Sequence, residues 1–134
     1  MVTTVNASTS SGLVNTADTS GIIKLQSNGV TTNALAWVNF NGTSSTPITP
    51  RANYNISSVT KISTGYYTLN FTSALTDINY VVIGSVGNGD TTSFSVISAS
   101  QTATPTTSSV SIYITNLSGT VVDRLYVNVA IFGN

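Results

Sequence analysis

The residues of this chain that could carry out chemistry are few and lie far apart. Its 134 residues include no His, no Cys and no Glu. The charged side chains are Asp18, Asp77, Asp90, Asp123, Lys24, Arg51, Lys61 and Arg124. General acid–base catalysis and nucleophilic catalysis draw largely on the missing residue types, and a glycosidase needs a pair of neighbouring carboxyl groups. We therefore expect a protein that is not an enzyme and that works by contact with other molecules.

The same inventory argues against a bound metal or cofactor. The segment Gly87-Asn88-Gly89-Asp90 looks like part of a calcium-binding loop, but calcium takes about six to eight oxygen ligands and this segment offers one carboxylate. A tight hairpin turn accounts for the segment better. We expect no cofactor and no metal site.

The charge balance bears on the partners of the chain. The formal net charge is zero at pH 7 and the basic residues are scattered, so neither nucleic acid nor an anionic membrane is expected as a partner. No apolar run approaches the roughly 20 residues that span a bilayer, so no membrane insertion is expected, and residues 1–8 do not resemble a secretory signal. Copies of a chain with so few charges repel one another weakly, which favours a homo-oligomer.

Strand signals dominate the chain, and helix signals are nearly absent. Short runs rich in Val, Ile, Thr, Tyr and Phe alternate with clusters of Gly, Asn, Ser and Pro. This pattern is typical of an all-β protein, and we predict an antiparallel β-sandwich of about eight strands. Residues 1–33 are predicted to form an extended N-terminal arm with one short strand at 21–26, closed by a turn at Ser27-Asn28-Gly29. Residues 34–134 are predicted to form the sandwich.

The alternation of apolar and polar residues predicts which side chains face the core. The residues expected to point inward are Tyr67, Leu69, Phe71, Phe94, Val96, Val110, Ile112 and Ile114. The apolar positions change parity between Ile56 and Val59, and a β-bulge at Ser57-Ser58 would restore one buried face. Residues 42–50 contain two prolines and are expected to form an exposed loop.

Two stretches are apolar on both faces, at residues 78–86 and 125–132. Such a strand is either central in a sandwich or pressed against another chain. Arg51 and the pair Asp123-Arg124 could form ion pairs, which contribute little at a surface and more when they are buried between subunits. The candidate assembly residues are Trp37, Arg51, Tyr80, Val82, Tyr126 and Phe132.

Aromatic side chains are candidates for a binding surface. Trp37, the only tryptophan, could stack on the ring of a sugar, but its apolar neighbours Ala36 and Val38 favour packing in the core or at a subunit contact. Tyr66 and Tyr67 are adjacent in a predicted strand and must point to opposite faces. The alternation along this strand makes Tyr67 the buried one and leaves Tyr66 as a platform for a ligand.

Several segments together resemble a module of known proteins. The segments are 36–43 (AWVNFNGT), 51–59 (RANYNISSV), 65–71 (GYYTLNF), 77–80 (DINY) and 129–134 (VAIFGN). From residue 34 to residue 134 the pattern is similar to a recurrent module of tailed-bacteriophage virion proteins, common in phages of marine bacteria and cyanobacteria at the C-termini of tail-fibre or tail-spike-like chains. The resemblance implies a β-rich, trimeric, host-facing or virion-decorating domain without enzymatic activity.

This resemblance defines the expected function and location. We expect a virion protein, either a tail fibre or receptor-binding tip that contacts a glycan or protein of the host surface, or a capsid decoration protein or head fibre. A homotrimer is favoured, attached to other virion proteins through residues 1–33. Loops tolerate variation on a rigid scaffold, so they are the expected sites of host contact. The candidate host-contact residues are Tyr66, Asn88, Asp90, Thr104 and Pro105.

Overall fold

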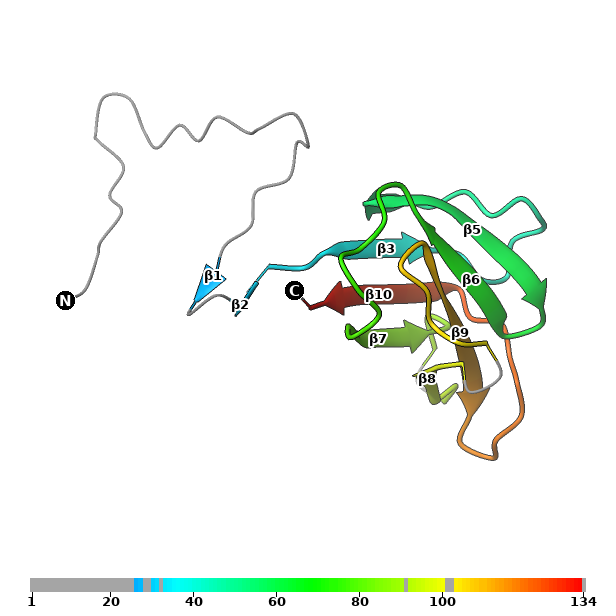
Figure 1. Cartoon of the computed structure of the whole chain (residues 1–134). Helices are drawn as coiled ribbons and strands as arrows, with labels where there is room; N and C mark the ends of the chain where they lie inside the picture. The colour runs from blue at the N-terminus through cyan, green and yellow to red at the C-terminus, as the bar shows by residue number, and fades with distance from the viewer. Residues whose placement is uncertain (1–25, 28–29, 32, 91, 101–102, 134) are drawn as a thin grey trace, which may run out of the picture.

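The computed structural model describes residues 26–27, 30–31, 33–90, 92–100 and 103–133 of the chain (Figure 1). The arm predicted at residues 1–33, with its short strand at 21–26, falls largely outside the described residues. Within that stretch, β1 (Gln26–Ser27) pairs antiparallel with β2 (Val30–Thr31).

Eight further strands form two four-stranded antiparallel sheets that pack face to face (Figure 1). The sheet that we call the β3 sheet has the order β4-β3-β10-β7, and the β6 sheet has the order β5-β6-β9-β8. Their bounds are β3 (Ala36–Phe40), β4 (Ala52–Tyr54), β5 (Ile56–Ser63), β6 (Tyr66–Phe71), β7 (Val81–Gly87), β8 (Ser95–Ala99), β9 (Ser109–Asn116) and β10 (Tyr126–Phe132). The described residues contain no helix. The predicted antiparallel β-sandwich of about eight strands is confirmed.

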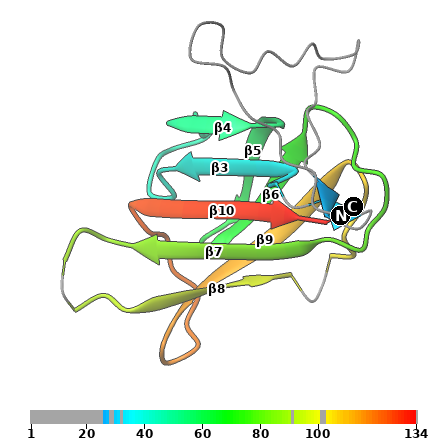
Figure 2. The same ribbon diagram turned by 90° about the vertical axis from the view of Figure 1, so that its left-hand side faces the viewer.

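The chain changes sheet at both edges of the sandwich. At one edge β4 continues into β5 through Asn55, whose φ of 54° lies in the left-handed region that Asn tolerates. The Asn55 amide ties this corner together, because Nδ2 donates to the carbonyls of Leu35 (3.1 Å) and Ser73 (3.2 Å) and Oδ1 accepts from Ser73 N–H (2.8 Å). At the other edge β7 and β8 run side by side in different sheets (Figure 2).

The tight hairpin predicted at residues 87–90 is wrong. β7 pairs with β10 and β8 pairs with β9, so the connection from Gly87 to Ser95 is a longer loop that crosses from one sheet to the other. A Gly-Asn-Gly-Asp sequence indicates that the chain changes direction. It does not indicate whether the flanking strands pair with each other or with distant segments.

The core lies between the two sheets and follows the alternation of the strands. The buried apolar residues are Ala36, Val38, Phe40, Ile48, Ile56, Val59, Tyr67, Leu69, Phe71, Leu75, Val110, Ile112, Ile114, Val127, Val129 and Ile131. Phe40 of the β3 sheet packs edge-on against Tyr67 of the β6 sheet, with ring centroids 5.1 Å apart. The inward positions predicted for β6 and β9 are confirmed, and Tyr67 is the buried member of the Tyr66-Tyr67 pair.

The inward prediction for Phe94 and Val96 is wrong. Phe94 precedes β8 and is 65% exposed, and Val96 is 51% exposed on the outer face. In β8 the inward residue is Ile97, which stands opposite the buried Ile114 and packs against the core. Val96 and Ile97 are adjacent apolar residues, so the pattern itself does not reveal which of them faces inward.

The bulge predicted at Ser57-Ser58 is confirmed, because Ile56 stands opposite Phe71 while Ser58 stands opposite Asn70. The loop predicted at residues 42–50 is only partly exposed. Ile48 within it is buried and makes an isolated antiparallel bridge to Val59. The loop therefore covers one margin of the core.

Candidate functional site

The outer face of the β6 sheet carries bonded hydroxyl and amide groups, together with the stacked pair of Tyr66 and Tyr113 and with Val96. Thr68 Oγ1 and Ser111 Oγ lie 2.8 Å apart. Asn70 Nδ2 donates to Ser58 Oγ (2.9 Å) and to Thr60 Oγ1 (3.1 Å). An antiparallel sheet with one face in water is expected to be polar on that face. The hydroxyl and amide part of this surface therefore needs no partner to explain its composition.

The outer face of the β3 sheet departs from that expectation. Trp37 on β3, Ala130 on β10 and Ile83 on β7 stand opposite one another and form one row across the three strands, which we call the Trp37 row. Trp37 is 40% exposed and Ile83 is 52% exposed. Beside this row, Val81 is 60% exposed opposite Phe132. Large apolar side chains gathered on one exposed face mark a surface that contacts another molecule.

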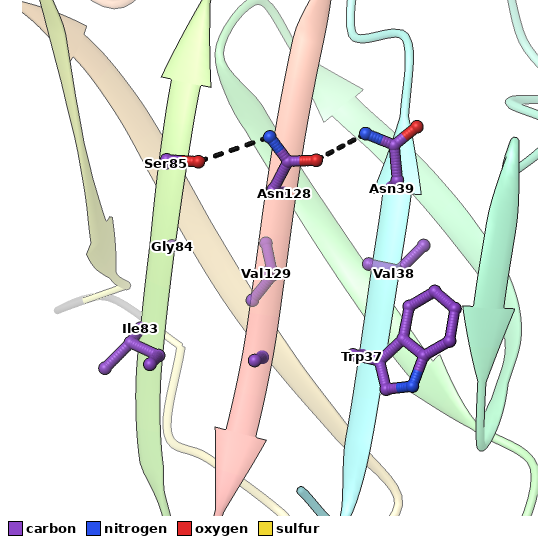
Figure 3. Close-up of a pocket in the computed structure, with 9 residues that line it drawn as sticks. Trp37, Val38, Asn39, Ile83, Gly84, Ser85, Asn128 and Val129 are labelled. Carbon is purple, nitrogen blue, oxygen red and sulfur yellow. Dashed lines mark hydrogen bonds between the residues drawn. The ribbon is translucent and has the colours of Figure 1, made fainter.

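The next row along the same strands is polar and internally bonded. Asn39, Asn128 and Ser85 stand opposite one another on β3, β10 and β7, and we call them the amide row. Asn39 Nδ2 donates to Asn128 Oδ1, and Asn128 Nδ2 donates to Ser85 Oγ at 3.2 Å (Figure 3). Each amide has two donor hydrogens and two acceptor lone pairs, so these bonds leave further capacity on the outer face.

Arg51 orients this row from the end of β3. Its Nη2 donates to the carbonyl of Leu125 at 2.9 Å, and its Nη1 donates to the carbonyl of Phe40 at 3.1 Å and to Asn39 Oδ1 at 3.5 Å. The guanidinium also lies 5.0 Å from the centroid of the Tyr126 ring. Because Arg51 approaches Oδ1, the Nδ2 group of Asn39 points toward Asn128, and the donors and acceptors of the row have one fixed order.

The two rows line a shallow groove of about 450 Å³. Its lining residues are Trp37, Val38, Asn39, Ile83, Gly84, Ser85, Asn128, Val129 and Ala130 (Figure 3). None of these residues carries an ionisable side chain. The groove thus combines an aromatic ring, aliphatic groups and oriented neutral polar groups, which is the composition of many small-molecule sites.

Four of the six predicted assembly residues lie on this outer face or at its end. These are Trp37, Arg51, Tyr126 and Phe132. The expectation that Trp37 packs in the core is wrong, because its neighbours Ala36 and Val38 are the inward residues and alternation turns Trp37 outward. A contact of Trp37 with another chain stays a prediction.

The remaining two predicted assembly residues support the sandwich itself. Val82 packs against the core. The Tyr80 hydroxyl contacts the carbonyls of Thr106 (2.9 Å) and Ser109 (3.1 Å), and its ring packs edge-on against Phe71. Burial raises the pKa of the Tyr80 phenol. Tyr80 therefore ties the segment before β7 to the segment before β9.

The predicted host-contact residues do not come together in one site. The loop with Asn88 and Asp90 lies at one end of the sandwich, and the loop with Thr104 and Pro105 lies at the other (Figure 2). Tyr66 is on the outer face of the β6 sheet. Its ring stacks on Tyr113 with centroids 4.2 Å apart. The three places are separate, so each residue's role as a host contact stays a prediction.

Asp90 organises its own loop. Its Oδ1 accepts hydrogen bonds from the N–H groups of Thr92 (2.9 Å) and Ser93 (2.6 Å), and its Oδ2 accepts from Asn88 Nδ2 (3.2 Å). Hydrogen bonds from the Ser93 side chain and from these two N–H groups hold the pKa of the exposed Asp90 carboxyl below its ordinary value. This arrangement is that of a turn in which a carboxylate caps the following backbone.

One cluster of ionisable groups was missed by the sequence analysis. Lys61 Nζ lies 2.6 Å from Asp123 Oδ2, while Asp123 Oδ1 accepts from Gly65 N–H at 2.9 Å and from the Tyr67 hydroxyl. Arg51 and Arg124, the expected partners, bind neutral oxygens instead, with Arg124 Nε donating to Ser95 Oγ at 2.7 Å. The sequence signal that could have revealed this cluster was the predicted burial of Tyr67, because a buried hydroxyl group needs a hydrogen-bond acceptor.

The environment of this cluster changes two pKa values. Burial raises the pKa of the Tyr67 phenol, and the hydrogen bond to Asp123 raises it further. Burial acts to raise the pKa of Asp123 as well, but hydrogen bonds from Gly65 N–H, Lys61 and Tyr67 outweigh it and the pKa lies below its ordinary value. The cluster connects β5 and β6 to the segment before β10, with Tyr67 fully buried and Lys61 and Asp123 partly exposed.

Two features are absent from the described part of the chain. No group of three or more His, Cys, Asp or Glu side chains is placed to hold a metal ion within the described part of the chain. In the same residues no helix is long and apolar enough to cross a membrane.

Comparison of the chain with protein-family models, curated proteins and solved structures finds no significant match. The class that the fold defines is a two-sheet antiparallel β-sandwich, with a groove of aromatic, aliphatic and amide groups on the outer face of the β3 sheet. The resemblance of residues 34–134 to the phage virion module stays a prediction.

Proposed function

We propose that this chain is a phage virion structural protein, a tail fibre or receptor-binding tip that contacts the host surface. The observation that carries the proposal is the groove on the outer face of the β3 sheet. There Trp37, Ile83 and Val81 are exposed beside the bonded amide row. A rigid sandwich with one contact face suits a protein that binds and does not turn over a substrate.

The carboxylate groups of the described Asp residues make local structural interactions, which agrees with a protein that works by contact with other molecules. Asp77 Oδ1 accepts from Asn79 N–H at 2.7 Å, Asp90 caps its own loop, and Asp123 is paired with Lys61. Among the described residues each Asp thus has a local structural role. Asp77, Asp90 and Asp123 bind separate partners and do not form a pair of carboxyl groups in one site, so we propose no enzymatic step.

The proposal includes a homotrimer attached to other virion proteins through residues 1–33. Support for self-association comes from the formal net charge of zero and from the 6% content of charged residues. Such a composition provides little repulsion between copies.

Immunogold electron microscopy of purified virions tests this proposal, with antibodies raised against the whole chain. We expect label at the tail tip, on the same particles that adsorb to host cells. Label over the head would instead establish the alternative, a capsid decoration protein. Absence of the chain from purified particles, judged by label and by mass spectrometry, would overturn a role in the virion.

A further inference from the structure

We propose that the groove on the outer face of the β3 sheet is a binding site for an uncharged hexopyranose glycan. The inference deepens the proposed function, because it names the chemical class of the receptor. Its parts are the exposed indole of Trp37 and the oriented donors and acceptors of the amide row.

Trp37 provides the apolar half of the site. A hexopyranose has an apolar face made of C–H groups and an edge of hydroxyl groups, so it binds well where an aromatic ring adjoins polar side chains. Trp37 stands between the inward-facing Ala36 and Val38 on the outer face of β3, and Figure 3 shows its ring on the side of β3 that faces β4, at the margin of the groove. An aromatic side chain with few rotatable bonds gives a large contact area at a small cost in conformational entropy.

The amide row provides the polar half. The amide row lies two residues from the Trp37 row along each strand, a distance of about 6.8 Å. Its three side chains are on neighbouring strands that lie about 4.8 Å apart. A sugar ring that covers Trp37 therefore presents its hydroxyl edge to Asn39 on the same strand, and Asn128 lies one strand further along the amide row. Each sugar hydroxyl both donates and accepts a hydrogen bond, and each amide offers both functions.

The absence of charged side chains in the groove favours an uncharged ligand. No lining residue is ionisable, and the nearest cation, Arg51, already donates to the carbonyls of Leu125 and Phe40. An acidic sugar would lose hydration on this face without gaining a free cation as a partner. A neutral hexose polymer loses nothing of that kind.

The size of the face favours a glycan over a second copy of this chain. Strands β3, β10 and β7 have five, seven and seven residues and together cover roughly 310 Å² of sheet at the usual strand spacings. A stable protein interface buries about 800 Å² of accessible surface on each partner, so it would have to extend beyond these three strands. The groove of about 450 Å³ lies within the roughly 300–1,000 Å³ typical of ligand sites.

Intrinsic fluorescence gives a direct readout, because Trp37 is the only tryptophan of the chain. The probes are maltotetraose, cellotetraose and α-1,6-mannotetraose, each added to the purified full chain up to about 20 mM, above the millimolar range expected for one shallow site. We expect a saturable change in the emission of Trp37 with at least one probe. A folded protein that responds to none of the three would overturn the proposal.

Matched variants locate the binding on this face. Asn128→Ala interrupts the amide row and should weaken binding of the responding probe about tenfold. The control is Asn70→Ala, which removes the same type of side chain, also bonded to two neighbours, from the outer face of the β6 sheet. The control should bind as the parent chain does, and equal weakening by both variants would overturn the assignment.

Trp37→Ala tests the aromatic half and distinguishes a glycan from a second copy. Isothermal titration calorimetry should show a loss of at least about tenfold in affinity for the responding probe, with the mass in light scattering unchanged. A fall in oligomer mass on this substitution would mean that the face joins subunits, and would overturn the proposal. These measurements use the purified chain, so their outcome is independent of whether the chain is found on virions.

Discussion

Asp123 connects the segment before β10 to β5 and β6 at one end of the sandwich. Its carboxylate binds Lys61 of β5, the N–H of Gly65 in the β5–β6 turn, and Tyr67 of β6. Gly65 has a φ of 64°, and a Cβ there would lie 2.7 Å from the carbonyl oxygen of Ile114, so only glycine fits this turn without a shift. The segment before β10 is thereby fastened to the β6 sheet.

Removal of this carboxylate should destabilise the fold. We expect Asp123→Asn to lower the free energy of unfolding by about 2 kcal/mol, because Lys61 loses its counter-ion and Tyr67 loses a charged acceptor. Urea unfolding followed by circular dichroism measures the change. Asp77→Asn is the control, since this partly exposed carboxylate caps one N–H, and its cost should be about 0.5 kcal/mol or less. Equal losses in the two variants would contradict the assigned role of Asp123.

The same carboxylate should make stability depend on acid pH. The folded-state pKa of Asp123 lies below its ordinary value, so its stabilising contribution is present above the unfolded-state pKa and is lost as the pH falls through the folded-state pKa. We expect the stability of the parent chain to fall below about pH 4, and that of Asp123→Asn to fall less steeply. Unfolding free energies measured between about pH 2 and pH 7 check this. Parallel pH profiles for the two proteins would count against it.

At the scale of elements, the corner between β4 and β5 depends on one side chain. Asn55 adopts a left-handed conformation and makes three hydrogen bonds to Leu35 and Ser73. We expect Asn55→Ala to cost about 3 kcal/mol, from the strained φ together with the lost bonds. Asn55→Gly loses the same three hydrogen bonds but adopts the left-handed conformation without strain, so it should lie between the parent and the Ala variant in urea unfolding. Identical stabilities for the Gly and Ala variants would show that backbone strain contributes nothing here.

The element that creates the candidate site is β10. It lies between β3 and β7, which confirms the central position considered for residues 125–132, whereas the stretch predicted at 78–86 supplies the edge strand β7. A shift of β10 by one residue would turn Asn128 and Ala130 inward and bring Val129 to the surface. Both rows of the groove therefore depend on the register of this one strand.

At the scale of the whole molecule, we expect self-association of the full chain. Light scattering should give about three times the 13.9 kDa of one chain, and the mass should persist on dilution. Charged residues are only 6% of the chain, so ion pairs should contribute little to the subunit contacts and high salt should leave the mass unchanged. A stable monomer would contradict the proposed trimer and leave the fold and the glycan site unaffected.

The local pattern of the sequence was sufficient for the strand class and for much of the core. The alternation in Tyr67, Leu69 and Phe71 encodes which face of β6 is buried, since successive side chains of a strand point to opposite faces. The parity change before Val59 marked the bulge for the same reason. Where two apolar residues are adjacent, as at Val96 and Ile97, the alternation is ambiguous and the prediction was wrong.

The candidate site was decided by the tertiary structure alone. Asn39, Ser85 and Asn128 are separated by more than 40 residues along the chain, yet they form one bonded row because β10 pairs with β3 on one side and with β7 on the other. The sequence by itself determined an all-β chain without His, Cys or Glu, through composition and period-two alternation. Pairing partners and register come from contacts between distant segments, and a local pattern does not contain them.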